Sequence, residues 1–174
     1  LISKLSKINE ALNFRWFCIP FDFMLKDDPK QLTKIAFDTI KYNKNSFINL
    51  LITNDKFLNV NSLTHVSNLV KKISLLSSNG FDNFRVGISN NIKPNTPFFP
   101  FSYHGFNQSA YTVALESLEL FINIVEKNKN QNLIELQKKF ELKLGIELKK
   151  INDLFVDVQS KNTFEYYGLD ASLA

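Results

Sequence analysis

The feature that most constrains the fold is an alternation of short apolar strands with amphipathic helices along the 174 residues. Apolar residues at helical spacing predict helices over 2–13, 29–43, 62–76, 110–127 and 131–160. Segments rich in aromatic and β-branched residues predict strands over 14–19, 46–52, 84–88 and 163–169. Strands alternating with helices of this length imply βαβ units and a largely parallel sheet. The predicted fold class is therefore α/β.

Three segments carry more specific expectations. Pro20 is expected to close the first strand, since proline cannot donate to a sheet. The nearly continuous apolar run 46–52 predicts a strand that is covered on both faces. The helix predicted over 110–127 is apolar around much of its circumference and is expected to be deeply buried.

Composition excludes several classes of protein. Apolar residues make up 44% of the chain, with 17 Phe, which is enough for a packed core and excludes wholesale disorder. The net charge is +4, but Arg15 and Arg85 are the sole arginines among 21 basic residues, which argues against a nucleic-acid partner. No apolar run is long enough to span a membrane, and one cysteine excludes an internal disulfide, so we expect a cytoplasmic protein.

The segment 89–107 differs from the rest of the chain because it holds three of the five prolines and no regular pattern. A loop of this length inside a compact domain is either functional or buried against something large. Ligands of parallel α/β sheets collect at the carboxyl ends of the strands. The segments expected there are 20–28, 89–107 and 170–174.

His104, in the long loop and just before a helix, is the first candidate for chemistry. Its imidazole suits a general base, a metal ligand or an anion site. The structural alternative is a histidine that bonds a backbone carbonyl and holds the loop. His65 falls on a helix, where we interpret it as structural or exposed.

Asp170 is the second candidate, at the end of a predicted buried strand and close to Ser172. Such a position suits an acid, a base or a metal ligand, and the alternative is an aspartate that caps a turn. Arg85 lies in an apolar strand, so its charge needs either an internal carboxylate or an anionic substrate. Cys18 is interpreted first as a small buried hydrophobe, with a reactive thiol as the alternative.

Two segments are specific in combination. The first is Asn95-Thr96-Pro97-Phe98-Phe99-Pro100, followed by Tyr103-His104 and then Ala114-Leu115-Glu116-Ser117. The second is Gly168-Leu169-Asp170-Ala171-Ser172-Leu173-Ala174. Together they resemble domain-of-unknown-function family 711, an uncharacterised family of archaea and bacteria. The resemblance is good over residues 80–174 and architectural before that.

The resemblance implies an α/β barrel similar to that of pyruvate formate-lyase and other glycyl-radical enzymes. It does not imply their chemistry, because the sequence holds no glycyl-radical loop and Cys18 matches no radical-site motif. Members of the family are longer than this chain. We therefore expect residues 1–174 to be a single α/β unit that is part of a longer barrel.

The leading hypothesis is an enzyme with a pocket at the carboxyl ends of the strands that binds a small molecule. The catalytic residues would be His104 and Asp170, and Arg85, Tyr103 and Ser172 would bind the substrate. The sequence leaves the cofactor open, with a divalent metal as one option. The alternative is a non-catalytic assembly protein, in which the Phe-rich loop and the broadly apolar helices form contacts in a homo-oligomer or with a second chain.

Overall fold

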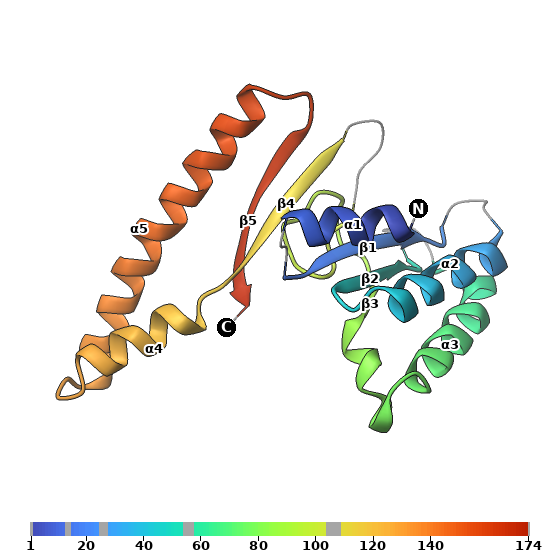
Figure 1. Ribbon diagram of the computed structural model, residues 1–174, viewed down its shortest axis with the longest axis horizontal. Helices are drawn as coiled ribbons and strands as arrows, with labels where there is room; N and C mark the ends of the chain where they lie inside the picture. The colour runs from blue at the N-terminus through green and yellow to red at the C-terminus, as the bar shows by residue number, and fades with distance from the viewer. Residues whose placement is uncertain (1, 13–14, 25–27, 54–57, 104–108, 174) are drawn as a thin grey trace. The chain divides into compact units, whose positions relative to one another are not determined.

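The structure of the protein is a computed structural model that describes residues 2–12, 15–24, 28–53, 58–103 and 109–173. The chain divides into two compact units (Figure 1). The first unit comprises residues 1–94 and 100–103, and the second comprises residues 95–99 and 104–174.

A parallel sheet of three strands forms the centre of the first unit. Its strands are β1 (Phe17–Asp22), β2 (Ser46–Leu51) and β3 (Val86–Ser89), in the order β1-β2-β3. The helices of this unit are α1 (Ile2–Leu12), α2 (Pro29–Tyr42) and α3 (Val60–Ser74). α2 connects β1 to β2, and α3 connects β2 to β3, so the predicted βαβ units and parallel pairing are confirmed.

The core of the first unit lies between the sheet and α2 and α3. Ile48 and Leu50 of β2 pack there with Ile40 of α2 and with Leu69 and Ile73 of α3. All six residues of β2 are buried, which confirms the strand covered on both faces. Burying one such aliphatic side chain contributes about 1.5–3 kcal/mol relative to leaving it exposed.

Capping residues set where the two helices begin. Asp28 precedes α2 and accepts a hydrogen bond from the Lys30 backbone N–H at 2.9 Å, with Pro29 in the first helical turn. Asn59 caps α3 and accepts from the Ser62 N–H at 3.3 Å. The helix therefore begins slightly earlier than the sequence pattern predicts.

The boundaries of β1 and β3 differ from prediction. β1 is Phe17–Asp22 and contains Pro20, which does not close it. β1 pairs with β2 alone among the described residues, and a proline is tolerated on such an edge strand because its missing N–H breaks no ladder on the open side. β3 begins at Val86 because a 3₁₀ segment, η1 (Ser78–Arg85), occupies the residues before it.

The second unit contains β4 (Ala110–Glu116), α4 (Leu118–Lys127), α5 (Leu133–Ser160) and β5 (Glu165–Leu173). β4 and β5 form a parallel pair. Aromatic rings connect this pair to α5: the Tyr111 ring lies edge-on to Phe155 at 5.8 Å and to Phe164 at 5.5 Å. The Phe155 and Tyr166 rings stack at 5.5 Å.

The helix predicted over 110–127 is wrong in its first half. Residues Ala110–Glu116 form β4, and α4 begins only at Leu118. The short apolar run fits a strand as well as a helix, and parallel pairing with β5 decides between them. The expectation of deep burial is also wrong, because α4 contains no buried residue.

The strands of the chain are parallel wherever they pair in named sheets, so the coarse prediction of a mixed α/β fold with a parallel sheet is confirmed. The described strands form two small sheets, and within these residues no closed barrel is formed. None of the helices in the described ranges has both the length and the apolar content needed to cross a membrane.

Candidate functional site

One face of the β1-β2-β3 sheet carries polar side chains. Side chains alternate between the two faces of a strand, so residues out of phase with the core-facing Ile48 and Leu50 lie on the face opposite α2 and α3. These include Cys18 in β1, Asn49 in β2 and Ser89 in β3. We call this surface the polar face.

A short segment of the long loop lies across the polar face. This segment, Pro100–Tyr103, belongs to the first unit, and we call it the strap. The Cys18 thiol donates a hydrogen bond to the Pro100 carbonyl at 2.9 Å. The Asn49 Nδ2 donates to the Phe101 carbonyl at 2.8 Å. Two strands of the sheet therefore hold two successive carbonyls of the strap.

A buried hydrogen-bond network continues from this contact. The Ser89 hydroxyl donates to Asn49 Oδ1 at 2.6 Å, and Ser89 Oγ also lies 3.5 Å from the Phe101 carbonyl oxygen. Asn49 is 0% and Ser89 is 2% exposed. The Phe101 ring sits over Gly87, where an added Cβ would lie 3.0 Å from the ring carbon Cε1. The lack of a side chain at Gly87 thus makes room for the strap.

Further polar groups lie where the strands end. The Asp22 carboxylate, at the end of β1, accepts from the Met24 N–H at 2.8 Å. Thr53, just after β2, accepts from the Asn91 N–H at 2.8 Å. Polar side chains therefore gather at the carboxyl edge of the sheet, where ligands of parallel α/β folds bind.

Tyr103 is the one predicted site residue that the structure places in the strap. Its hydroxyl donates to the Ile92 carbonyl at 2.7 Å, so it connects the strap to the beginning of the long loop. The ring is half-buried. This contact fixes the end of the strap that lies nearest to His104 in the sequence.

The interpretation of Cys18 as a small packed residue agrees with its surroundings. The residue is half-buried, and burial raises the pKa of the Cys18 thiol well above its ordinary value. A thiol in that state is protonated at neutral pH and is a poor nucleophile. Cys18 therefore contributes to the polar face as a weak hydrogen-bond donor.

Arg85 lies at the opposite edge of the sheet, before the first residue of β3. Its Nη1 donates to the carbonyls of Asn43 at 2.8 Å and Ser46 at 3.2 Å, and its Nη2 donates to the carbonyl of Ile40 at 2.9 Å. Nη2 also contacts the Asp82 carboxylate at 2.5 Å, and the hydrogen bond from Arg85 lowers the pKa of Asp82.

These contacts show the first of the two alternatives for Arg85, an internal carboxylate partner. The guanidinium also satisfies carbonyl groups at and beyond the end of α2, which carry the partial negative charge of the helix terminus. The structure does not bring Arg85 to the carboxyl edge, where Asp22 and Ser89 lie.

Asp170 lies inside β5, opposite Ala114 of β4. The expectation of an aspartate at the strand end is therefore wrong in position, because β5 continues to Leu173. Asp170 is 5% exposed, and its carboxylate accepts from the Phe99 N–H at 2.8 Å. A buried carboxylate thus anchors the Phe-rich part of the long loop in the second unit.

Gly168 brings the same two segments together. Its φ of 115° is a conformation that other residues rarely adopt, and a Cβ at this position would lie 3.6 Å from Cγ of Pro97. The two sequence segments that carry the family resemblance therefore contact each other in the second unit, through the pairs Pro97–Gly168 and Phe99–Asp170.

Two predicted site residues are not described in full. His104 lies outside the described residues, and Ser172 lies in β5 with its side chain outside the description. His65 is half-buried on α3, in keeping with a structural residue. Whether His104 and Asp170 act together stays a prediction.

Sequence reasoning does not find the polar face. The pattern assigns Asn49 to an apolar strand, Ser89 to the start of the long loop and Asp22 to the segment after the first strand. A signal exists for Asn49, since it is the one amide inside the apolar run 47–52. A buried amide must be hydrogen-bonded, which indicates a partner that crosses the sheet.

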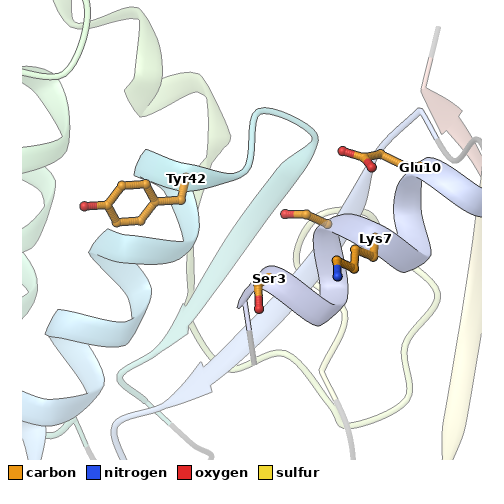
Figure 2. A pocket seen from close by; sticks show the side chains of 5 residues that line it. Ser3, Lys7, Glu10 and Tyr42 are labelled. Carbon is orange, nitrogen blue, oxygen red and sulfur yellow. The ribbon is translucent and has the colours of Figure 1, made fainter.

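A depression lies on another part of the first unit, between α1 and the end of α2 (Figure 2). It is wide and open, with a volume of about 510 Å³, and its lining residues are Ser3, Ser6, Lys7, Glu10 and Tyr42. The surface of this depression is mostly apolar. It offers no convergent set of polar groups comparable to the polar face.

A metal site needs several ligand side chains close together. In the parts of the chain that the structure describes, three or more His, Cys, Asp or Glu side chains nowhere gather closely enough to hold a metal ion. The polar face offers one carboxylate, from Asp22, beside neutral groups.

Comparison with known proteins adds a family and nothing more specific. No curated protein and no solved structure matches the sequence. The family model described as "Uncharacterised ACR (DUF711)" matches residues 23–174, which include β2 with Asn49, the strap and both segments of the resemblance. The chain therefore belongs to the DUF711 family.

Proposed function

We propose that the chain contributes the binding site of an enzyme that acts on a small polar molecule, at the polar face and carboxyl edge of the β1-β2-β3 sheet. The observation that carries the proposal is Asn49, a fully buried carboxamide in the otherwise apolar run 47–52 of the central strand. An apolar residue would pack there without needing partners. A buried polar network near the carboxyl end of a parallel sheet fits a ligand site.

The side chains of the polar face favour a class of ligand. Those that β1, β2 and β3 present on this face include one carboxylate, Asp22, one carboxamide and one hydroxyl, and no cation. Such a surface complements hydroxyl and amine groups better than phosphates. The substrate class that we propose is a small hydroxyl- or amine-bearing molecule.

For the second unit, the acid–base residues that we propose are His104 and Asp170, and the binding residue is Ser172. Tyr103 is the binding residue that we propose for the first unit. Support for Asp170 comes from its burial and from its contact with the loop that leads to His104. Arg85 is left out of the proposed site, because its contacts lie at the other edge of the sheet.

Thermal-shift screening of the purified chain tests the proposal. The panel contains polyols, amino sugars and polyamines, with sugar phosphates and nucleotides as contrast. We expect a hydroxyl- or amine-bearing compound to raise the melting temperature, and Asp22→Asn and Tyr103→Phe to reduce that rise. Matched controls are Asp157→Asn and Tyr42→Phe, which make the same changes at exposed positions of α5 and α2. Equal loss in the control variants, or stabilisation by phosphates alone, would contradict the proposal.

The acid–base assignment needs a separate test once a ligand is found. His104→Gln and Asp170→Asn should abolish turnover while leaving the thermal shift with the ligand. The paired controls are His65→Gln, at the second of two histidines, and Asp157→Asn. Turnover that survives both site variants would remove His104 and Asp170 from the mechanism.

The family resemblance supports a further proposal about architecture. We infer that the parallel strands belong to an α/β barrel of the pyruvate formate-lyase kind, in a cytoplasmic protein that does not use glycyl-radical chemistry. The parallel pairing of every named strand and the βαβ connections support it. An experimental structure with an antiparallel or open arrangement of these strands would contradict it.

The alternative function, a non-catalytic assembly protein, is favoured by one observation in the second unit. Its helices expose large apolar side chains, among them Leu118, Leu133, Ile134, Leu142 and Leu154. Light scattering after size exclusion tests this alternative. A stable oligomer that dissociates on Leu142→Glu would favour assembly, and a monomer at high concentration would count against it.

A further inference from the structure

We propose that Asn49 is the positioning residue of this site, because its carboxamide holds the strap Pro100–Tyr103 on the polar face. We call the hydrogen bond from Asn49 to the Phe101 carbonyl the latch. In the proposal, the latch controls access of ligands to the polar face. A role in ligand access rests on the proposed function. The latch itself is a property of the first unit that can be measured without any ligand.

The carboxamide of Asn49 is used at both ends. Nδ2 donates to the Phe101 carbonyl at 2.8 Å, and Oδ1 accepts from the Ser89 hydroxyl at 2.6 Å. The Ser89 hydroxyl therefore fixes which end of the amide faces the strap. A side chain of this length needs one donor and one acceptor to satisfy both partners, which asparagine supplies and an ionised aspartate or a leucine does not.

Burial makes this latch effective. Asn49 is fully buried, so water cannot replace its donor when the strap is in place. Without Nδ2, the nearest described alternative for the Phe101 carbonyl is the Ser89 Oγ at 3.5 Å, which is long for a hydrogen bond. The loss therefore falls on the strap and not on the helices across the sheet.

Three further contacts of the strap are of weaker kinds. Cys18 holds the Pro100 carbonyl through a thiol, which is a weak donor. Phe101 contacts the sheet at Gly87 through its ring. Tyr103 bonds to Ile92, which belongs to the same loop and not to a strand. Of these four contacts, the hydrogen bond from the Asn49 amide is the strongest polar one.

Asn49→Asp tests the latch because it changes one donor into an acceptor with almost no change in shape. At pH 8 the carboxylate faces the Phe101 carbonyl oxygen and repels it. We expect hydrogen–deuterium exchange of the strap to be about tenfold faster than in the wild-type chain, as for loss of one buried hydrogen bond. Peptides from β2 and α3 should exchange as in the wild type.

Lowering the pH gives a signature that a merely structural role would not produce. At pH 5 the buried carboxyl that Asn49→Asp introduces regains a proton, and its O–H can donate to the Phe101 carbonyl. The ratio of variant to wild-type exchange in the strap should therefore fall towards one. The titratable side chains on the neighbouring strands β1 and β3 and on the strap are Cys18, Asp22 and Tyr103. They are present in both proteins, so the ratio removes their effect.

A chemical probe gives an independent readout. Cys18 is the single cysteine of the chain, and its thiol bonds to the strap. Opening of the strap should expose it to iodoacetamide, so Asn49→Asp should raise its alkylation rate by a similar factor at pH 8. Asn68→Asp makes the same change at an exposed site on α3 and should leave both rates unchanged.

Ser89→Ala keeps the experiment decisive if Asn49→Asp weakens the whole unit. It removes only the hydroxyl that orients the amide, and we expect a rise of about threefold confined to the strap. The proposal is overturned if neither variant accelerates exchange in the strap selectively, or if the acceleration caused by Asn49→Asp persists at pH 5. Failure of the ligand screen with a working latch would instead reject the proposed function alone.

Discussion

The two units of this chain are stabilised by different kinds of contact. In the first unit, β2 is buried along its whole length and α3 contributes buried Val66, Leu69 and Ile73. In the second unit, α5 runs from Leu133 to Ser160 without one buried residue. The first unit is held by a core between layers, whereas the second is held by aromatic contacts and by local helical bonds.

The difference teaches where sequence changes will matter. A two-stranded sheet with one layer of helices leaves most apolar side chains partly in water, so each contributes little. A side chain in the core of the first unit loses all of its contacts when truncated. The same substitution should therefore have very different effects in the two units.

Leucine truncation gives the largest expected effect. Leu69→Ala in α3, at a residue 2% exposed, should lower the free energy of unfolding by about 2–5 kcal/mol. Leu142→Ala in α5, at a residue 70% exposed, should change it by less than about 0.5 kcal/mol. Both values come from urea unfolding, with Trp16 fluorescence for the first unit and circular dichroism for α5.

The contrast between the two units would be wrong if Leu142→Ala lowered the free energy of unfolding as much as Leu69→Ala does. That result would mean that the outer face of α5 is covered in solution, as the assembly alternative requires. Repeating the measurement at several protein concentrations separates the two cases, because only a covered interface makes the cost depend on concentration.

Glycine substitutions should have opposite signs in the two units. Gly87→Ala places a Cβ 3.0 Å from the Phe101 ring and should destabilise the first unit by about 1–3 kcal/mol. Gly145→Ala in α5 meets no atom within 4 Å and should stabilise the helix by about 0.5–1 kcal/mol. Thermal unfolding of both variants checks the signs, and a stabilising Gly87→Ala would show that the strap does not rest on β3.

The smallest expected effect is a loss of stability of the first unit at low pH. The Arg85 hydrogen bond lowers the pKa of Asp82 below its value in the unfolded chain, so this pair stabilises the first unit at neutral pH. The contribution should be lost as the pH falls below about 4 and through the folded pKa. Asp82→Asn should cost up to about 1 kcal/mol at pH 7 and nothing at low pH, as measured by urea unfolding. A cost that is independent of pH would show that the geometry of Arg85, and not the charge of Asp82, matters.

Much of the first unit could be predicted from the sequence. Asp28 with Pro29 marks the start of α2, and the apolar run of β2 marks a strand covered on both faces. These signals come from residues that are adjacent in the sequence, and both elements form in the structure where the signals indicate. The misassigned strand β4 shows the limit, since residues 110–116 satisfy helical and strand patterns alike and only the distant β5 decides between them.

The site was less predictable than the fold for a related reason. Tyr103 and Asp170 came from motifs, but their hydrogen-bond partners, Ile92 and Phe99, depend on the path of the loop. Arg85 is a candidate for anion binding in the sequence because its neighbours there are apolar. Its actual partners are mostly carbonyl groups around the end of α2, about forty residues away, which no local pattern reveals.

The pairing of β4 with β5 has a consequence for the order of folding. The strands are separated along the chain by α4 and α5, so they meet only after the connection 117–164 has closed. Helices form far faster than such distant contacts, and a preformed helical hairpin shortens the effective loop. The hairpin of α4 and α5 therefore brings β5 close to β4. Before that moment β4 has no partner, and its helix-like sequence leaves it free to extend α4 towards the amino terminus.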